Sequence, residues 1–284
     1  MFSRTFALGP FNFKINSQII KVKTELERLY KDFVPVADAD FIDFDINITQ
    51  PPNIRRWLRP QVDFIVDEFK PFKPLPLNHA YPMLEWGMNW CIASNAHHFF
   101  IMHAAAIEKN NKVIVLPAQS GAGKSTLSAA LSYNGWRLFS DELALFSLKN
   151  KLLYPLARPI NLKNDSIDII RNYIPNAVFS EVVHDTHKGT VALLKPPLDS
   201  VKQVNIENPL ACFVFPKYVE NSPVRLKACS VEQAFSSIIE QSFNYHILGK
   251  EAFELVSYYL RNVKAYTLEY SDFIQANDAL SELV

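Results

Sequence analysis

The chain has few cysteines, few glycines and no net charge. Its 284 residues include only Cys91, Cys212 and Cys229, without C-x-x-C spacing, which excludes a disulfide framework or zinc knuckle and favours a reducing compartment. Twenty-nine basic residues balance 29 acidic ones, so no global field attracts nucleic acid or an anionic membrane. No stretch approaches the roughly 20 apolar residues of a bilayer-spanning helix, and residues 1–17 lack a signal-peptide core. We therefore expect a cytoplasmic protein.

Two of the seven glycines lie in the most informative segment. Residues 117–126 read Pro-Ala-Gln-Ser-Gly-Ala-Gly-Lys-Ser-Thr, after an apolar run at 113–116 and before helix-forming residues at 126–134. This order predicts a strand, a phosphate-binding loop and a helix whose N-terminal dipole faces the phosphates. Ala118 stands where the Walker pattern has glycine. The predicted ATP-binding residues are Ser120, Gly121, Ala122, Gly123, Lys124, Ser125 and Thr126.

Within this loop, two side chains have separate predicted tasks. Lys124 can reach the β- and γ-phosphates, and the Ser125 hydroxyl can ligate Mg²⁺. ATP and Mg²⁺ are therefore the expected cofactors.

A second candidate site is the pair Asp141-Glu142, at the end of the short apolar segment 136–139. Two adjacent carboxylates after a P-loop helix occupy the place of a Walker B acid. One can hold Mg²⁺ and the other can accept a proton from an attacking hydroxyl. The alternative is a helix N-cap, since Ser140-Asp-Glu is also typical of a helix start.

A third candidate is His103, in an apolar segment that precedes the P-loop strand. Small neighbours, Ala104 to Ala106, leave room around its ring. A lone histidine in such a run is more often an ordinary core residue than a functional one.

The chain divides near residue 75 in its sequence pattern. Residues 42–48 and 62–66 alternate apolar and polar side chains, the period of half-buried strands, and residues 21–33 have helical spacing. The proline-rich residues 70–77 are expected to form a stiff connector. We therefore expect residues 1–75 to form an N-terminal α+β unit that could dock a partner, and residues 76–284 to form a P-loop kinase-like domain.

In the second part, apolar periodicity predicts helices at 85–94, 232–243 and 251–260. It predicts strands at 99–107, 143–146, 151–154 and 211–215, the last closed by Pro216, and a hairpin turn at 109–112. Strands on both sides of one P-loop helix indicate an α/β fold with a mixed sheet, not a doubly wound parallel one.

Together these segments resemble the HPr kinase/phosphorylase family. That family has a histidine before the loop and a Gly-x-Arg-Leu stretch leading to two acids, matched here by His103, Gly135, Arg137, Leu138 and Asp141. His103 lies 15 positions before Ala118, and Lys124 lies 17 before Asp141. The subgroup of HPr kinase-related kinases of type A is closer. Its blocks are matched by residues 84–90, 103–105, 140–142, 158–164, 186–190 and 242–245.

This resemblance implies a phosphoenolpyruvate-carboxykinase-like P-loop fold and transfer of the ATP γ-phosphoryl to a serine of a protein or peptide. It implies that Asp141 is the general base, that His103 orients or tunes it, and that Lys124 acts in catalysis. Glu142, a predicted Mg²⁺ ligand with Ser125, replaces the family's second aspartate. Thr126 replaces an acidic residue, and the family's signature stretch is missing after the acids. We therefore do not infer that HPr is the substrate of this protein.

Three further cations, Arg158, Lys163 and Lys188, are expected to stabilise the transferred phosphoryl group. Gly189 would let backbone approach an anion. Two other function classes remain open: a catalytically silent nucleotide-binding switch or scaffold, and a small-molecule kinase. A homo-oligomer is also left open.

Overall fold

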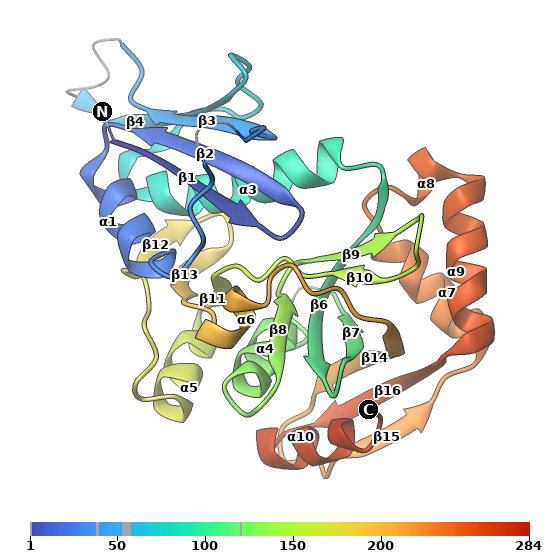
Figure 1. The fold of residues 1–284 in the computed structure, drawn as a ribbon. Coiled ribbons are helices and arrows are strands. Elements are labelled where there is room, and N and C mark those ends of the chain that lie inside the picture. The colour runs from blue at the N-terminus through green and yellow to red at the C-terminus, as the bar shows by residue number, and fades with distance from the viewer. Residues whose placement is uncertain (1, 38–39, 53–57, 120) are drawn as a thin grey trace.

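The structure of the protein is a computed structural model that describes residues 2–37, 40–52, 58–119 and 121–284. These residues form three sheets with helices packed on them (Figure 1). Parallel and antiparallel pairs occur in the same sheets, so the predicted mixed α/β fold is confirmed. No helix in the described ranges is long and apolar enough to cross a bilayer.

The first sheet contains the N-terminal strands in the order β1-β2-β3-β4-β5. Its strands are β1 (Phe2–Leu8), β2 (Phe11–Ser17), β3 (Phe44–Thr49), β4 (Gln61–Val66) and β5 (Leu75–Pro76). The strands predicted at 42–48 and 62–66 are present, whereas β1 and β2 were not predicted. The predicted connector, residues 70–77, includes β5, whose Pro76 pairs with Gln61 at the edge of the sheet.

Two helices cover this sheet, α1 (Ile20–Leu29) and α3 (Ala80–Asn95), the latter entered through the 3₁₀ turn η1 (Leu77–His79). Their buried side chains share one apolar core with the five strands and with Ile101, Leu145 and Leu193 of later strands. The unit predicted at 1–75 thus continues its core into the rest of the chain. Its division at residue 75 stays a prediction.

The large sheet has the order β10-β9-β6-β7-β14-β16-β15, with β8 paired to β6. Its strands are β6 (Phe99–Lys109), β7 (Lys112–Pro117), β8 (Arg137–Ser140), β9 (Leu143–Ser147), β10 (Leu153–Tyr154), β14 (Leu210–Tyr218), β15 (Arg225–Ala228) and β16 (Lys264–Tyr270). The predicted hairpin at 109–112 is present as the antiparallel pair β6–β7. The strands predicted at 143–146 and 151–154 form a second antiparallel pair, β9–β10. The strand predicted to close at Pro216 continues to Tyr218, because its pairing with β7 ends at Phe213 and leaves one side without a ladder partner.

Helices pack on both faces of the large sheet. One face carries α4 (Lys124–Ser132) and α10 (Phe273–Ser281), and the other carries α7 (Val231–Glu240) and α9 (Lys250–Asn262), joined by α8 (Tyr245–Leu248). The helices predicted at 232–243 and 251–260 are therefore present as α7 and α9.

A third sheet, β11-β13-β12, lies beside α4. It contains β11 (Ile160–Lys163), β12 (Val183–Thr186) and β13 (Gly189–Leu194), with α5 (Asp165–Tyr173) packed on it and the short α6 (Leu198–Lys202) following. This arrangement brings the β11 end and the β12–β13 turn to the start of α4, where the predicted site residues lie.

Candidate active site

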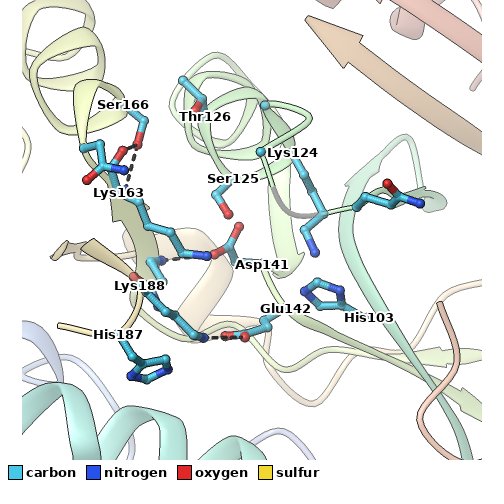
Figure 2. A pocket seen from close by; sticks show the side chains of 15 residues that line it. His103, Lys124, Ser125, Thr126, Asp141, Glu142, Lys163, Ser166, His187 and Lys188 are labelled. Carbon is cyan, nitrogen blue, oxygen red and sulfur yellow. Dashed lines mark hydrogen bonds and ion pairs between the residues drawn. The ribbon is translucent and has the colours of Figure 1, made fainter. Parts of the chain in front are cut away.

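The predicted loop, acids and histidine line one cavity of about 420 Å³ (Figure 2). It lies where β7 passes into α4. Its walls are His103, Gln119, Gly121, Gly123, Lys124, Ser125, Thr126, Asp141, Glu142, Asn161, Lys163, Asn164, Ser166, His187 and Lys188. Segments far apart in the sequence, from β6 to the β12–β13 turn, therefore converge on the loop predicted to bind phosphate.

The loop backbone adopts conformations that favour glycine. Gly121 and Gly123 have φ of 91° and 88°, in the left-handed region where side chains are strained. A Cβ on Gly123 would also lie 2.7 Å from the hydroxyl of Tyr270, which donates a hydrogen bond to the Gly123 carbonyl at 3.2 Å. The Ala122 carbonyl accepts from the Tyr218 N–H at 3.3 Å. The ends of β14 and β16 thus hold the loop in place.

Helix α4 begins at this loop without a side-chain cap. The first N–H groups of a helix have no intrahelical acceptor, and here Gly123 at the N-cap position supplies none through a side chain. These donors and the positive end of the helix dipole favour an anion at this point.

Lys124 is the first residue of α4 and only 7 % exposed. Its Nζ is buried without a hydrogen-bond partner among the described residues. Burial lowers the pKa of Lys124 to about 8, although Asp141 and Glu142 oppose the shift. A buried ammonium without a partner is costly, and this makes Lys124 Nζ the candidate contact for an anion in the cavity.

Asp141 is buried at the end of β8 and fixed by two donors. The Ser128 hydroxyl donates to Oδ1 at 3.0 Å, and the Asn161 N–H donates to Oδ2 at 3.0 Å. Burial raises the pKa of Asp141 despite the opposing charge of Lys124. Its carboxylate is thus oriented and more basic than an exposed one, as a general base requires.

Glu142 is half-buried and held by different partners. The Asn89 amide donates to Oε2 at 2.7 Å, and Lys188 forms an ion pair with Oε1 at 3.4 Å. Burial alone raises the pKa of Glu142, but Lys188 and Lys124 outweigh it and leave the pKa below its usual range. Glu142 is therefore ionised at neutral pH, unlike a proton donor.

Behind Glu142 lies a buried chain of hydrogen bonds. Arg158 donates to the Asn89 side-chain oxygen and forms an ion pair with Glu85. The Tyr30 hydroxyl donates to the same Glu85 carboxylate at 3.0 Å. This chain connects α1 through α3 to the cavity.

Arg158 itself does not line the cavity, although it was predicted to bind the nucleotide. Its guanidinium forms an ion pair with Glu85 and donates a hydrogen bond to Asn89. In this conformation Arg158 is therefore linked to Glu142 through Asn89.

His103, on β6, faces Lys124 and Glu142 in the cavity (Figure 2). Burial and the charge of Lys124 lower the pKa of His103 to about 4, against the opposing effect of Glu142. The imidazole is therefore neutral at pH 7. Within the described ranges no hydrogen bond joins His103 to Asp141, so its predicted support of Asp141 stays a prediction.

The turn between β12 and β13 brings His187 and Lys188 to the cavity. Gly189 has φ of 84°, and a Cβ there would lie 2.6 Å from the Asn164 side-chain oxygen. A side chain at position 189 would therefore clash with Asn164. The expected approach of the Gly189 backbone to an anion stays a prediction. Lys163 lines the cavity from β11, and burial together with Lys188 lowers its pKa.

The sequence interpretation missed Asn161 and Asn89, although both lie in segments matched to the family. The Asn161 side-chain oxygen is buried without a hydrogen-bond partner in the described structure. No local pattern identifies these residues, because their contacts join distant segments.

Ser120 lies outside the described residues. The alternative N-cap role of Ser140 is wrong: β9 follows, and Ser140 Oγ accepts from the N–H groups of Glu142 and Leu143.

Among known proteins, similarity is found to solved structures, and it is distant. No protein-family model matches the chain, and no curated protein is similar to it. Among solved structures, it is similar to the HPr(Ser) kinase/phosphatase from Coxiella burnetii, with 12 % identity and a TM-score of 0.29. The similarity covers 64 % of this chain and 96 % of the other. At this level it indicates a distant structural relationship and carries no argument about chemistry.

Proposed function

We propose that this cavity binds Mg·ATP and that the protein transfers the γ-phosphoryl group to a serine hydroxyl of a protein or peptide. The observation that carries the proposal is the buried ammonium of Lys124, which has no partner in the described structure and lies at the uncapped start of α4. A fixed cation and free backbone donors at one point form a site for phosphate oxygens.

The remaining cavity cations fit the same ligand. Lys163 and Lys188 also line the cavity, and their ammonium groups point toward Asp141 and Glu142 (Figure 2). Phosphoryl transfer spreads negative charge over peripheral oxygens, and fixed cations stabilise it. Lys188 now pairs with Glu142, and we propose that it moves to the γ-phosphate when the nucleotide binds.

Ser125 and Glu142 are the residues that fit Mg²⁺. The described residues contain no group of three histidine, cysteine or acidic side chains able to hold a metal. A cation here would take its other ligands from phosphates and water, as Mg²⁺ commonly does. The metal would neutralise charge on the phosphates; Glu142 is ionised for that contact.

The orientation and the hydrogen bonds of the Asp141 carboxylate fit the role of the general base. Its carboxylate accepts the proton of the serine hydroxyl while that oxygen bonds to the γ-phosphorus. The bond from this phosphorus to the β–γ bridging oxygen breaks, and ADP leaves with the electron pair. Ser128 and Asn161 hold the carboxylate in place through both oxygens.

The test is a transfer assay with γ-labelled ATP and a panel of serine-containing peptides, followed by mass spectrometry of the products. We expect phosphoserine on a peptide, with the label lost in Lys124→Ala. Nucleotide binding without transfer would support a silent switch instead. Phosphate found only on a metabolite added to the panel would support a small-molecule kinase.

A further inference from the structure

A second cavity, of about 510 Å³, adjoins the phosphate cavity. We call it the α3–α8 groove; its apolar walls are Trp86, Trp90, Leu143, Phe243 and Ile247. Phe243 and Ile247 are 42 % and 54 % exposed. The volume lies within the roughly 300–1,000 Å³ of ordinary ligand pockets.

The groove is continuous with the candidate active site. Glu142 and Lys188 line both cavities. Phe243 also packs against His103, with ring centroids 6.0 Å apart. A group bound in the groove would therefore contact the same Glu142–Lys188 pair that lines the phosphate cavity.

Its position matches the approach needed for transfer. The loop and Lys124 form one side of the phosphate cavity, and Glu142 lies on the side away from the loop (Figure 2). An acceptor oxygen must attack opposite the leaving oxygen. The groove shares Glu142 and Lys188 with that side of the cavity.

The lining chemistry indicates the occupant. Aromatic and aliphatic side chains dominate, and the charged pair Glu142–Lys188 is internally neutralised. Ser94, His97 and His246 also line the groove, and such polar side chains can bond a peptide backbone.

We propose that the α3–α8 groove is the acceptor site and that it binds a peptide segment with a large apolar side chain next to the acceptor serine. The inference rests on the proposed function and specifies its substrate class. The apolar side chain lies among Trp90, Phe243 and Ile247, and its burial holds the serine hydroxyl near Asp141. Such positioning contributes strongly to a two-substrate reaction.

The experiment uses the full chain, Mg·ATP and peptides that share one serine but differ beside it: tryptophan or leucine against glycine, aspartate or lysine. We expect kcat/KM for apolar neighbours to exceed that for glycine by about tenfold or more, the scale of burying one such side chain. Ile247→Lys should remove this preference and leave ATP affinity unchanged. Ile274→Lys is the matched control, since Ile274 on α10 is 58 % exposed and does not line the groove.

A measurement of peptide binding tests the groove independently of the transfer reaction. Trp86 and Trp90 line the groove, so their fluorescence should report peptide binding even if no phosphate moves. Binding of apolar-flanked peptides without transfer, lost in Ile247→Lys, would keep the groove and reject the kinase reaction. The acceptor-site proposal would be contradicted if kcat/KM and binding were the same for all residues beside the serine. Identical effects of Ile247→Lys and Ile274→Lys would contradict it as well.

Discussion

At the scale of single residues, the site depends on how burial changes proton affinity. Burial raises the pKa of Asp141, while it lowers that of His103 and of Lys124. Glu142 stays ionised because Lys188 and Lys124 outweigh its burial. Opposite shifts in neighbouring groups are typical of acid–base sites, and two of them lead to predictions.

The first prediction concerns Asp141. Asp141→Asn removes the base but keeps the size of the side chain, so kcat should fall by roughly 10²–10⁴ while ATP affinity changes little. Steady-state kinetics and calorimetry measure the two quantities. A variant that transfers phosphate at the wild-type rate would show that Asp141 is not the base.

The second prediction is proton uptake when ATP binds. The pKa of Lys124 is about 8 in the free protein, and phosphates beside it favour the ammonium and raise that pKa. At pH 8 the binding of Mg·ATP should therefore take up on the order of half a proton, and less at pH 7. Calorimetry in buffers of different ionisation enthalpy measures the uptake. Lys124→Met should abolish it; equal uptake in both proteins would contradict the assignment.

The lowered pKa of Lys124 also makes folding stability depend on pH. Between pH 8 and the unfolded value of 10.5, the unfolded chain holds the Lys124 proton and the folded chain does not. The contribution of this group to stability therefore rises with pH through that range.

At the scale of elements, the position of Glu142 depends on α3. Asn89 donates to Glu142 and accepts from Arg158. Asn89→Ala should therefore raise the Mg²⁺ concentration needed for half-maximal activity, by roughly tenfold for a lost charge-assisted hydrogen bond. High Mg²⁺ should restore the rate.

Asn95→Ala is the matched control, because Asn95 ends the same helix and its amide donates to the Cys91 carbonyl within that helix. A purely structural role of Asn89 would lower thermal stability without moving the Mg²⁺ dependence. That outcome would contradict the positioning role.

The sequence predicted those elements whose identifying residues lie within the element itself. The β6–β7 hairpin has apolar runs around Asn110-Asn111, which adopt φ of 56° and 60°, and the P-loop segment has its glycines. The N-terminal hairpin β1–β2 was not predicted, although Phe11, Phe13 and Ile15 alternate with polar residues as in a half-buried strand. The contact of Asn89 with Glu142 spans 53 positions, and no local period encodes it.

At the scale of the molecule, the N-terminal sheet and α3 share a core. A Cβ on Gly87 would lie 2.0 Å from the ring of Phe64, so β4 packs directly on the α3 backbone. Gly→Ala in a helix usually stabilises by about 1 kcal/mol. Here Gly87→Ala should destabilise by about 1–3 kcal/mol, the cost of overpacking.

Denaturant unfolding measures this change, and Ser94→Ala on the exposed face of α3 is the control, expected to be near neutral. A Gly87→Ala protein more stable than wild type would contradict the shared core. The shared core also means that removing residues 1–75 would expose α3. Truncation therefore does not isolate the predicted docking role of this unit.

The central claim is that the buried ammonium of Lys124 is placed for the phosphates of ATP. The most direct measurement is a calorimetric titration of the wild type and Lys124→Ala with Mg·ATP. The account predicts binding to the wild type that is weakened in the variant by about 2–3 kcal/mol, the scale of a charge-assisted hydrogen bond. Equal affinity in the two proteins, or no binding to the wild type, would contradict it.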